Sequence, residues 1–361
     1  MQPNKINQKS FEGQTIYTSI DMHLKSWKVS IFSEHHEHKT MSREPNEEQL
    51  AEYLKKHFPG ANYKAVYEAG FSGFTTCRKL NNLGIECCVI HPADVPTSQK
   101  DRLQKTDKAD SRKLGKMLRS GEFEPVHVPD EELEMNRALV RQRYRVMKDL
   151  SRQKQRVKSM LYQFGIKIPE RFTPSQSGQW SKVYMDWLRE LPGVAEGIRK
   201  LVVNYINVGI DLKKHLLELT RQVKALSKKK RYSSNYTLLL GIPGIGPLAA
   251  MNILVQLGDI ERFRSLDHLC NYVGLVPTMQ GSGEKMVTGK MTRRGRRELK
   301  IILIEAAWVA VRKDPALMLR FDTLSSRMPK NKAIIRIAKN LLSRARHVIR
   351  HGNEYVTGVT G

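Results

Sequence analysis

Four carboxylates in the first third of the chain stand where predicted secondary-structure elements begin or end. Asp21 and Glu68 each end a strand-like segment, while Asp107 and Asp110 are three residues apart at the start of a predicted helix and project from one face. Strand ends that meet at one sheet edge could hold all four around two Mg²⁺ ions. Such ions activate the attacking oxygen and stabilise the leaving oxygen of a phosphoryl transfer. Taken singly, each residue has a plainer explanation, because an Asp after a strand is commonly a turn residue and Asp107 could be an N-cap.

The chain carries a large excess of positive charge. Its 361 residues include 62 Lys and Arg against 36 Asp and Glu, a formal net charge of +26. Such an excess costs self-repulsion and is normally tolerated because a polyanion supplies the counter-charge, although a merely soluble basic protein is the alternative. No apolar run approaches the ~20 residues of a membrane span, and the first thirty residues contain no apolar signal core. We therefore expect a cytoplasmic protein that binds nucleic acid and no membrane.

The first 125 residues show an α/β pattern. Alternating apolar and polar residues predict the first two strands, the last strand is predicted to be more buried, and amphipathic spacing predicts helices. The predicted strands are Thr15–Asp21, Trp27–Phe32, Tyr63–Ala69 and Ile85–Ile90, and the predicted helices are Asn46–His57, Thr75–Leu83 and Asp107–Arg119. This order favours a mixed sheet with helices on its faces. We interpret His35, His36 and His38 as a polar turn, and the four cysteines, which form no CxxC pair, as buried thiols.

The middle of the chain predicts two long helices. Residues 130–164 contain no Gly or Pro and carry an apolar seam that Arg143 and Lys154 interrupt. A second seam runs from Ile198 to Leu226 at spacings of four and three, with only Gly209 out of place. These seams predict an antiparallel helical hairpin or an intermolecular coiled coil.

The first long helix is strongly basic. Nine Lys or Arg lie between Arg137 and Lys158, with the single acid Asp149. A helical face this charged repels a like partner unless a nucleic acid neutralises it, and the residue types leave DNA and RNA equally open. The candidate nucleic-acid contacts on it are Arg137, Arg141, Arg145, Lys148, Arg152 and Arg156.

The last third of the chain, from about Ser233, is predicted to be mostly helical and contains two glycine-rich turns. Gly241–Gly246 has the form of a helix-hairpin-helix turn, in which amides near Gly244 and Gly246 could bind a phosphate, although a purely structural connection is the alternative. In the second turn, Ser282 lies between two glycines, which permit the close approach that an exposed nucleophile needs. A serine in a flexible polar loop is the plainer explanation there. The cations around this serine are Lys285, Arg293, Arg294, Arg296 and Arg297.

The order of the acids resembles a known plan. A first-strand Asp followed by a hairpin, a strand-borne acid and a helical acid pair resembles the RNase H-like, RuvC-type nucleases. The segments SIDMHLKSWKVSIF, AVYEAGFSGF and KTDKADSRKLGKML look like the amino-terminal domain of the DEDD transposases of the one-ten family of insertion sequences, most of all its eleven-eleven branch. This resemblance implies that Asp21, Glu68, Asp107 and Asp110 form a catalytic tetrad that binds Mg²⁺.

The second half of the chain is similar to the carboxy-terminal transposase domain of the same family. The similarity lies in LLLGIPGIGPLAAMNILVQLGD and NYVGLVPTMQGSGEKMVTGKMTRRGRRELKIILIEAAW. It implies that Ser282 is a nucleophile that forms a transient phosphoserine link to DNA. It also implies a structured guide RNA (a bridge RNA) that pairs with the target DNA and with the element's DNA.

The combined prediction is an α/β plus α protein with three domains. These are an RNase H-like (RuvC-like) domain over residues 1–125, a coiled-coil helical domain over 126–232 and a mostly helical, serine-bearing transposase domain over 233–361. The predicted function is an RNA-guided DNA transposase/recombinase that assembles through its coiled coil as a dimer or tetramer. Two alternatives remain open: a structure-selective, Mg²⁺-dependent endonuclease resembling a junction resolvase, and a non-catalytic nucleic-acid-binding protein.

Overall fold

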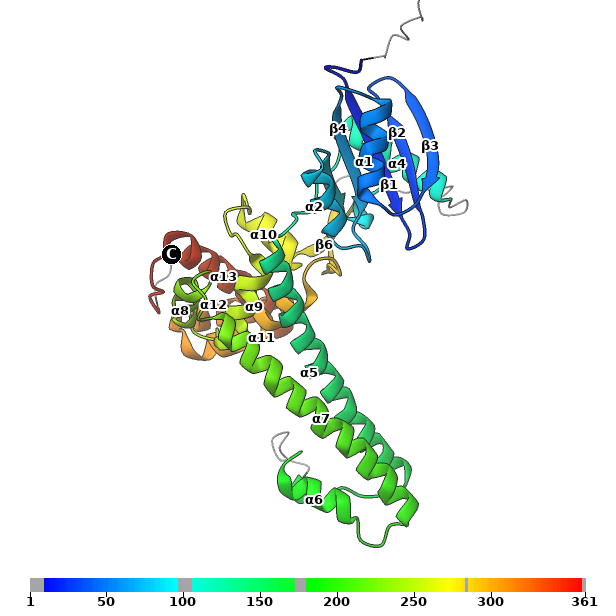
Figure 1. Ribbon diagram of the computed structural model, residues 1–361. Coiled ribbons are helices and arrows are strands. Elements are labelled where there is room, and N and C mark those ends of the chain that lie inside the picture. The colour runs from blue at the N-terminus through cyan, green and yellow to red at the C-terminus, as the bar shows by residue number, and fades with distance from the viewer. Residues whose placement is uncertain (1–9, 97–105, 173–179, 283–284, 359–361) are drawn as a thin grey trace, which may run out of the picture. The chain divides into compact units, whose positions relative to one another are not determined.

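The computed structural model describes the chain apart from residues 1–9, 97–105, 173–179, 283–284 and 359–361, and it leaves out the side chains of residues 279–288. The described backbone separates into two compact units, Met1–Pro129 and Asp130–Gly361 (Figure 1). The finer division into three domains stays a prediction.

A five-stranded mixed sheet forms the centre of the first unit. In pairing order its strands are β3 (Glu37–Arg43), β2 (Trp27–Phe32), β1 (Thr15–Met22), β4 (Asn62–Glu68) and β5 (Glu86–Ile90). Strands β1, β2 and β3 pair antiparallel, whereas β4 is parallel to β1 and β5 is parallel to β4. The mixed sheet that the sequence predicts is therefore confirmed.

Helices cover both faces of this sheet. They are α1 (Glu47–His57), α2 (Thr75–Asn82) and α4 (Asp107–Ser120), with a short 3-10 helix, η1 (Pro92–Asp94), after β5. Leu50 of α1 and Leu80 of α2 pack into the core on one face. Leu114 and Leu118 of α4 pack against Val66 and Ile90 on the other. Strand β4 is accordingly buried on both faces, since Ala65 and Tyr67 belong to one core and Val66 belongs to the other.

Small residues allow α4 to lie close to the sheet. The hydroxyls of Ser30 and Ser111 are 2.6 Å apart, and the Ser19 hydroxyl donates to the carbonyl of Ser111. A Cβ added at Gly115 would overlap the ring of Phe32. Because Ser19 lies on β1 and Ser30 on β2, this packing fixes the start of α4 relative to the end of β1.

Strand β3 is not predicted from the sequence. It contains His38, so the interpretation of His35, His36 and His38 as one polar turn is wrong for His38, whereas His35 and His36 do lie between strands. The reason is that β3 is an edge strand with mostly exposed or half-exposed residues, EHKTMSR. Backbone hydrogen bonds to β2 define this strand. Because it needs no buried apolar face, its sequence shows no apolar alternation.

Two long helices form a hairpin in the second unit. The elements are α5 (Glu131–Gln163), η2 (Glu170–Phe172), α6 (Lys182–Glu190) and α7 (Glu196–Leu226) (Figure 1). Arg143 donates from Nε to the hydroxyl of Thr220 at 2.8 Å, and Gln153 donates from Nε2 to the carbonyl of Tyr205 at 2.8 Å. The earlier residue of α5 thus pairs with the later residue of α7, and the later residue of α5 pairs with the earlier one. The two helices therefore form an antiparallel hairpin within the chain.

The residues that interrupt the apolar seams have specific partners. Arg143 has the bond to Thr220, and Lys154 places Nζ 5.8 Å from the centroid of the Trp180 ring. A Cβ added at Gly209 would overlap the same indole. Trp180, just before α6, therefore explains two of the three irregular positions.

Replacing Gly209 with Ala is expected to destabilise the hairpin by about 1–3 kcal/mol, because the indole of Trp180 must move. Thermal unfolding of the full chain measures this effect. Gly197→Ala is the matched control, since its Cβ would lie in open space on the same helix. That control should leave stability unchanged or slightly higher. Equal melting temperatures for the two variants would contradict the role given to Trp180.

Helices dominate the rest of the second unit, as predicted. The elements are α8 (Ser233–Leu240), α9 (Pro247–Leu257), α10 (Leu266–Val273), β6 (Pro277–Ser282), β7 (Lys285–Met291), α11 (Arg297–Lys313), α12 (Pro315–Ser325) and α13 (Lys330–His351). Helix α9 is buried from Ala250 to Leu257 and lies at the centre of the core. The antiparallel pair β6–β7 stands where the sequence predicts only a glycine-rich turn.

Two smaller expectations concern membranes and thiols. Among the residues that the structure describes, no helix combines the length and the apolar character needed to cross a bilayer. The four cysteines are free thiols, three of them buried and Cys88 half-buried.

Candidate active site

The carboxylates of Asp21 and Asp107 converge on one histidine. Asp21 is the last residue but one of β1, and Asp107 is the first residue of α4. The Nε2 atom of His23 lies 3.4 Å from Oδ2 of Asp21 and 3.5 Å from Oδ2 of Asp107. One potential ligand atom from each of these side chains lies within 4.8 Å of the other two. The packing of α4 against β1 thus joins residues that are far apart in the sequence.

Local backbone features hold this group in place. His23 begins the turn between β1 and β2, which a 3.1 Å hydrogen bond from its backbone N–H to the Ser26 carbonyl closes. Thr106 caps α4 with its side chain and fixes the first turn, which carries Asp107 and Asp110.

The other two predicted ligands lie at the same edge of the sheet. Ile20 of β1 is opposite Tyr67 of the parallel strand β4, so Asp21 and Glu68 are the next residues on two adjacent strands. Asp110 is close enough that its negative charge raises the pKa of Asp21. Neither Glu68 nor Asp110 belongs to the three-residue group within 4.8 Å, so the structure brings two of the four predicted ligands into close contact and the other two near them.

Burial is the main cause that raises the pKa of Asp21 above its usual value. The charges of Asp107 and Asp110 raise it further, while attraction and a hydrogen bond from His23 lower it. This excess of negative charge favours a divalent cation, which would reverse the repulsion. Carboxylate oxygens are the ligands that Mg²⁺ prefers, whereas the imidazole of His23 suits Mn²⁺ or Zn²⁺ better.

Sequence reasoning misses His23. Its only signal is its position two residues after the strand-end acid Asp21, in a tight turn. A potential ligand at that spacing could be noticed, but its contact with Asp107 depends on how α4 packs.

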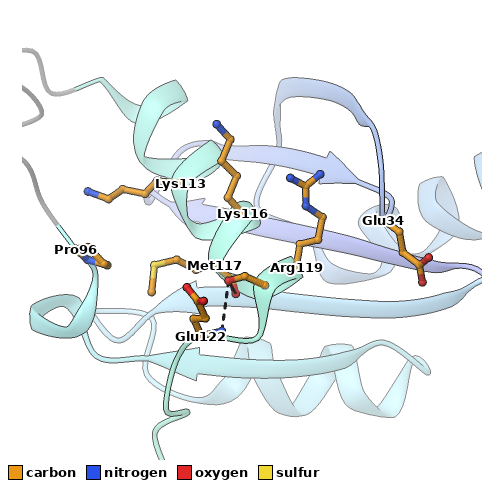
Figure 2. Close-up of a pocket in the computed structure, with 8 residues that line it drawn as sticks. Glu34, Pro96, Lys113, Lys116, Met117, Arg119 and Glu122 are labelled. Carbon is orange, nitrogen blue, oxygen red and sulfur yellow. Dashed lines mark hydrogen bonds between the residues drawn. The ribbon is translucent and has the colours of Figure 1, made fainter.

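A separate open pocket of about 570 Å³ lies along the C-terminal half of α4 (Figure 2). Its polar lining combines Lys113, Lys116 and Arg119 with Glu34 and Glu122. The four predicted ligands do not line it. Its cations continue along α4 away from the carboxylates at the helix start, which suits contact with phosphates of a bound strand.

Ser282 is the last residue of β6, opposite Lys285, the first residue of β7. The side chains of both residues lie outside the described part of the structure. The backbone therefore places the predicted nucleophile at the end of an antiparallel pair of strands.

The basic loop that follows β7 is held by two glycines. Gly274 and Gly295 both have positive φ, and a Cβ on either would overlap the backbone of the other segment. This contact holds the loop against the end of α10. Arg293, Arg294 and Arg297 are exposed, whereas Arg296 is partly buried.

The predicted cations of α5 differ in exposure. Arg137 is only 4% exposed and donates to the carbonyls of Val255 and Gln256. It therefore stabilises the fold, and its prediction as a nucleic-acid contact is wrong. Arg141 is partly buried. The exposed cations of the helix are Arg145, Lys148, Arg152 and Arg156.

The two glycines of the Gly241–Gly246 turn have different surroundings. A Cβ on Gly244 would overlap the carbonyl of Ala306 in α11, so this glycine allows the turn to pack closely against that helix. Gly246 is exposed at the start of α9, which lacks a side-chain cap. Pro247, the first residue of α9, has no N–H, and the Ile245 N–H donates to the Ile242 carbonyl, so neither neighbour of Gly246 offers an amide to an anion.

Comparison with known proteins decides the family. A family model named for the DEDD transposases of IS110 matches residues 19–166. A second model, described as the transposase IS116/IS110/IS902 family, matches residues 236–322, and the two together cover more than half of the chain. The chain belongs to the IS110 family of transposases. The first match contains Asp21, Glu68, Asp107 and Asp110, and the second contains Ser282.

Individual relatives of this IS110-family transposase are distant. A putative transposase of Sinorhizobium fredii is 29% identical over 67% of the chain and 57% of its own length. The transposase for insertion sequence element IS1533 of Leptospira borgpetersenii is 25% identical over 68% of the chain and 70% of its own length. The pilin gene-inverting protein of Moraxella bovis is 32% identical over 33% of the chain and 38% of its own length.

Proposed function

We propose that this IS110-family transposase cuts and rejoins DNA strands by phosphoryl transfer at the carboxylates around the end of β1. The observation that carries the proposal is the convergence of Asp21 and Asp107 on His23, with Glu68 beside Asp21 on the adjacent strand. Carboxylates gathered at one sheet edge repel one another, and a divalent cation relieves that repulsion.

Asp21, Glu68, Asp107 and Asp110 would hold Mg²⁺. Bound magnesium stabilises the negative charge that develops on phosphate oxygens during strand transfer. The protein's own contribution is to hold these carboxylates at fixed positions, through the cap of Thr106 and the packing of α4.

Ser282 would act as the nucleophile. Its Oγ would form a bond to phosphorus while one phosphorus–oxygen bond of the DNA breaks; the serine proton passes to a base, and the leaving DNA oxygen takes up a proton. Phosphodiester energy is conserved in the phosphoserine link, so the strand can be rejoined without ATP. A free serine hydroxyl is a poor nucleophile. The exposed Arg293 and Arg297 would therefore have to stabilise the phosphate charge beside it.

A structured guide RNA would bind along α5. The exposed cations Arg145, Lys148, Arg152 and Arg156 lie over about three turns of this helix. Such a row contacts phosphates of a structured RNA by shape and charge. DNA could use the same row, so the binding test includes both.

Reversing Arg145, Arg152 and Arg156 to Glu is expected to weaken RNA binding by at least about a hundredfold and to lower its salt dependence, because fewer counterions are released. Binding of labelled RNA and DNA at several salt concentrations measures this. The control reverses three exposed cations on other helices, namely Arg312, Lys313 and Arg320. Equal losses in both triple variants would mean that net charge, and not the α5 surface, controls binding.

A homo-oligomer, either a dimer or a tetramer, remains part of the proposal. The seam on α7 already packs within the chain, since Leu219 and Val223 are buried in the hairpin. Leu201, Val208 and Leu217 remain about half exposed on the same helix. These residues, and not the seam, are the candidates for contacts between subunits.

A structure-selective endonuclease is the second candidate. One observation favours it: all four carboxylates lie in the first unit, so hydrolysis by water would not require Ser282. The similarity to a relative named as a pilin gene-inverting protein argues against an endonuclease, because inversion of a gene needs both cutting and rejoining of DNA. The test is a reaction with the DNA that flanks the gene, stopped with denaturant and treated with protease. A peptide joined to DNA supports the transposase, and cleaved DNA without any adduct supports the endonuclease.

A further inference from the structure

Two guanidinium groups lie over the ring of Tyr272 in α10. Cζ of Arg262 is 4.6 Å from the centroid of the Tyr272 ring, and Cζ of Arg296 is 5.1 Å from it. The Tyr272 hydroxyl donates a 2.9 Å hydrogen bond to the carbonyl of Gln256. A ring held in this way restricts both cations.

Helix α5 adds two more guanidinium groups at the same place. Arg137 donates from Nη2 to the Gln256 carbonyl at 3.0 Å, and Arg141 donates from Nη2 to the Gln256 side-chain oxygen at 3.3 Å. Arg262 donates from Nε to the carbonyl of Leu257 at 3.1 Å. These carbonyls end α9, and their partial negative charge attracts cations. The arginine cluster is the set Arg137, Arg141, Arg262 and Arg296.

The arginine cluster holds more positive charge than the acids around it neutralise. Within the described residues, none of its guanidinium groups has a carboxylate at ion-pair distance. Two acids act on it from further away: Glu298, one of whose oxygens is buried without a hydrogen-bond partner, and the exposed Asp259. Burial lowers the pKa of Arg137, Arg141 and Arg262, which shows that their charges are poorly solvated. Poorly solvated charges of one sign favour a bound anion.

The start of α11 lies at the same cluster. Arg296 is its N-cap residue and makes no side-chain cap, so the first amides of this 17-residue helix have no side-chain acceptor at the cap. Arg141, Arg145 and Arg296 all attract the carboxylate of Glu298 in its first turn, which places them around the helix start. Free amides at a helix N-terminus bind anions.

We propose that Arg141, Arg296 and the first amides of α11 bind one backbone phosphate of a nucleic acid. Arg141 and Arg296 are partly exposed, whereas Arg137 is buried behind them and Nη2 of Arg262 is inaccessible to water. Arg137 and Arg262 are therefore positioning residues that act through Gln256 and Tyr272. Planar guanidinium groups match pairs of phosphate oxygens.

A nucleic acid fits this site better than free phosphate. The exposed Arg145 and Arg297 extend the positive charge beyond what a single phosphate would need. The site rests on the proposed function, because that function supplies the nucleic acid.

The test is binding of the full chain to a fluorescent DNA duplex and to a fluorescent RNA hairpin, measured by anisotropy over a range of salt concentrations. Arg141→Gln and Arg296→Gln should each lower affinity about tenfold and reduce the salt slope by about one. The ligand that shows the loss, DNA or RNA or both, is the source of the phosphate. Arg320→Gln, exposed on α12, is the matched control and should change neither quantity.

The phosphate site would be overturned if the folded Gln variants bound both ligands with wild-type affinity and wild-type salt dependence. In that case, DNA cleavage by the wild type would still support the proposed function. A wild type that binds neither ligand would overturn both. If Arg141→Gln lowers the melting temperature, Arg141→Lys distinguishes the effect of lost charge from the effect of lost packing. This variant keeps the charge and should retain the wild-type salt slope. A slope reduced as in Arg141→Gln would show a folding defect and overturn the proposal.

Discussion

Asp21→Asn is expected to lower DNA strand cleavage by at least about a thousandfold while nucleic-acid binding stays at the wild-type level. The substitution removes one anionic ligand from the group that Asp21 forms with His23 and Asp107. Asparagine keeps the shape of the side chain and one acceptor oxygen for His23. Cleavage of labelled DNA that flanks the gene measures the effect. Glu48→Gln, an exposed carboxylate on α1 of the same unit, is the control and should cleave normally.

The same variant gives a second, independent result in the absence of metal. Because burial and neighbouring carboxylates raise the pKa of Asp21, the folded state holds its proton more tightly than the unfolded chain does. Ionised Asp21 therefore costs stability above the unfolded-state pKa, and stability falls as pH rises through the folded-state pKa. Asp21→Asn should raise the melting temperature by about 2 °C at neutral pH, and this difference should vanish below about pH 4. A lower melting temperature at neutral pH would mean that loss of cleavage reflects damage to the fold.

Ser282→Ala is expected to eliminate both recombination and the covalent adduct with DNA, a loss of at least about ten-thousandfold. The substitution removes only the oxygen that would attack phosphorus. Since Ser282 is the last residue of β6, removal of its hydroxyl should leave folding, metal binding and RNA binding intact.

Two threonines near Ser282 provide matched controls. Thr278→Ala and Thr288→Ala remove hydroxyls from β6 and β7, at positions close to the serine in the sequence, and should leave recombination unchanged. Recombination by Ser282→Ala, or an adduct that maps to either threonine, would contradict the assignment. A nuclease that uses water would then explain the carboxylates better.

Local sequence patterns were enough to predict much of the fold. The short, largely apolar segments of β1, β2, β4 and β5 predict strands because much of each strand is buried under the helices. The seam positions Val202, Leu219 and Val223 are buried as their spacing predicts. The edge strand β3 and the pair β6–β7 lack such a pattern, because backbone pairing and not apolar burial defines them.

The site was less predictable, because it depends on how distant elements pack. Asp21 and Asp107 could be selected as acids at element ends, but their shared contact with His23 arises only because Gly115 and Ser111 let α4 approach the sheet. Charge alone also predicts the role of single residues wrongly. Arg137 lies in a basic run that suggests phosphate binding, yet its guanidinium is buried and bonded to the end of α9.

The central claim is that carboxylates around Asp21 support metal-dependent phosphoryl transfer on DNA. The most direct measurement is cleavage of the flanking DNA by the full chain with its guide RNA, first in EDTA and then after addition of excess Mg²⁺. The account predicts no cleavage in EDTA, full recovery with Mg²⁺, and no recovery for Asp21→Asn at any Mg²⁺ concentration. Cleavage that persists in EDTA, or full Mg²⁺-dependent activity of a folded Asp21→Asn protein, would contradict it.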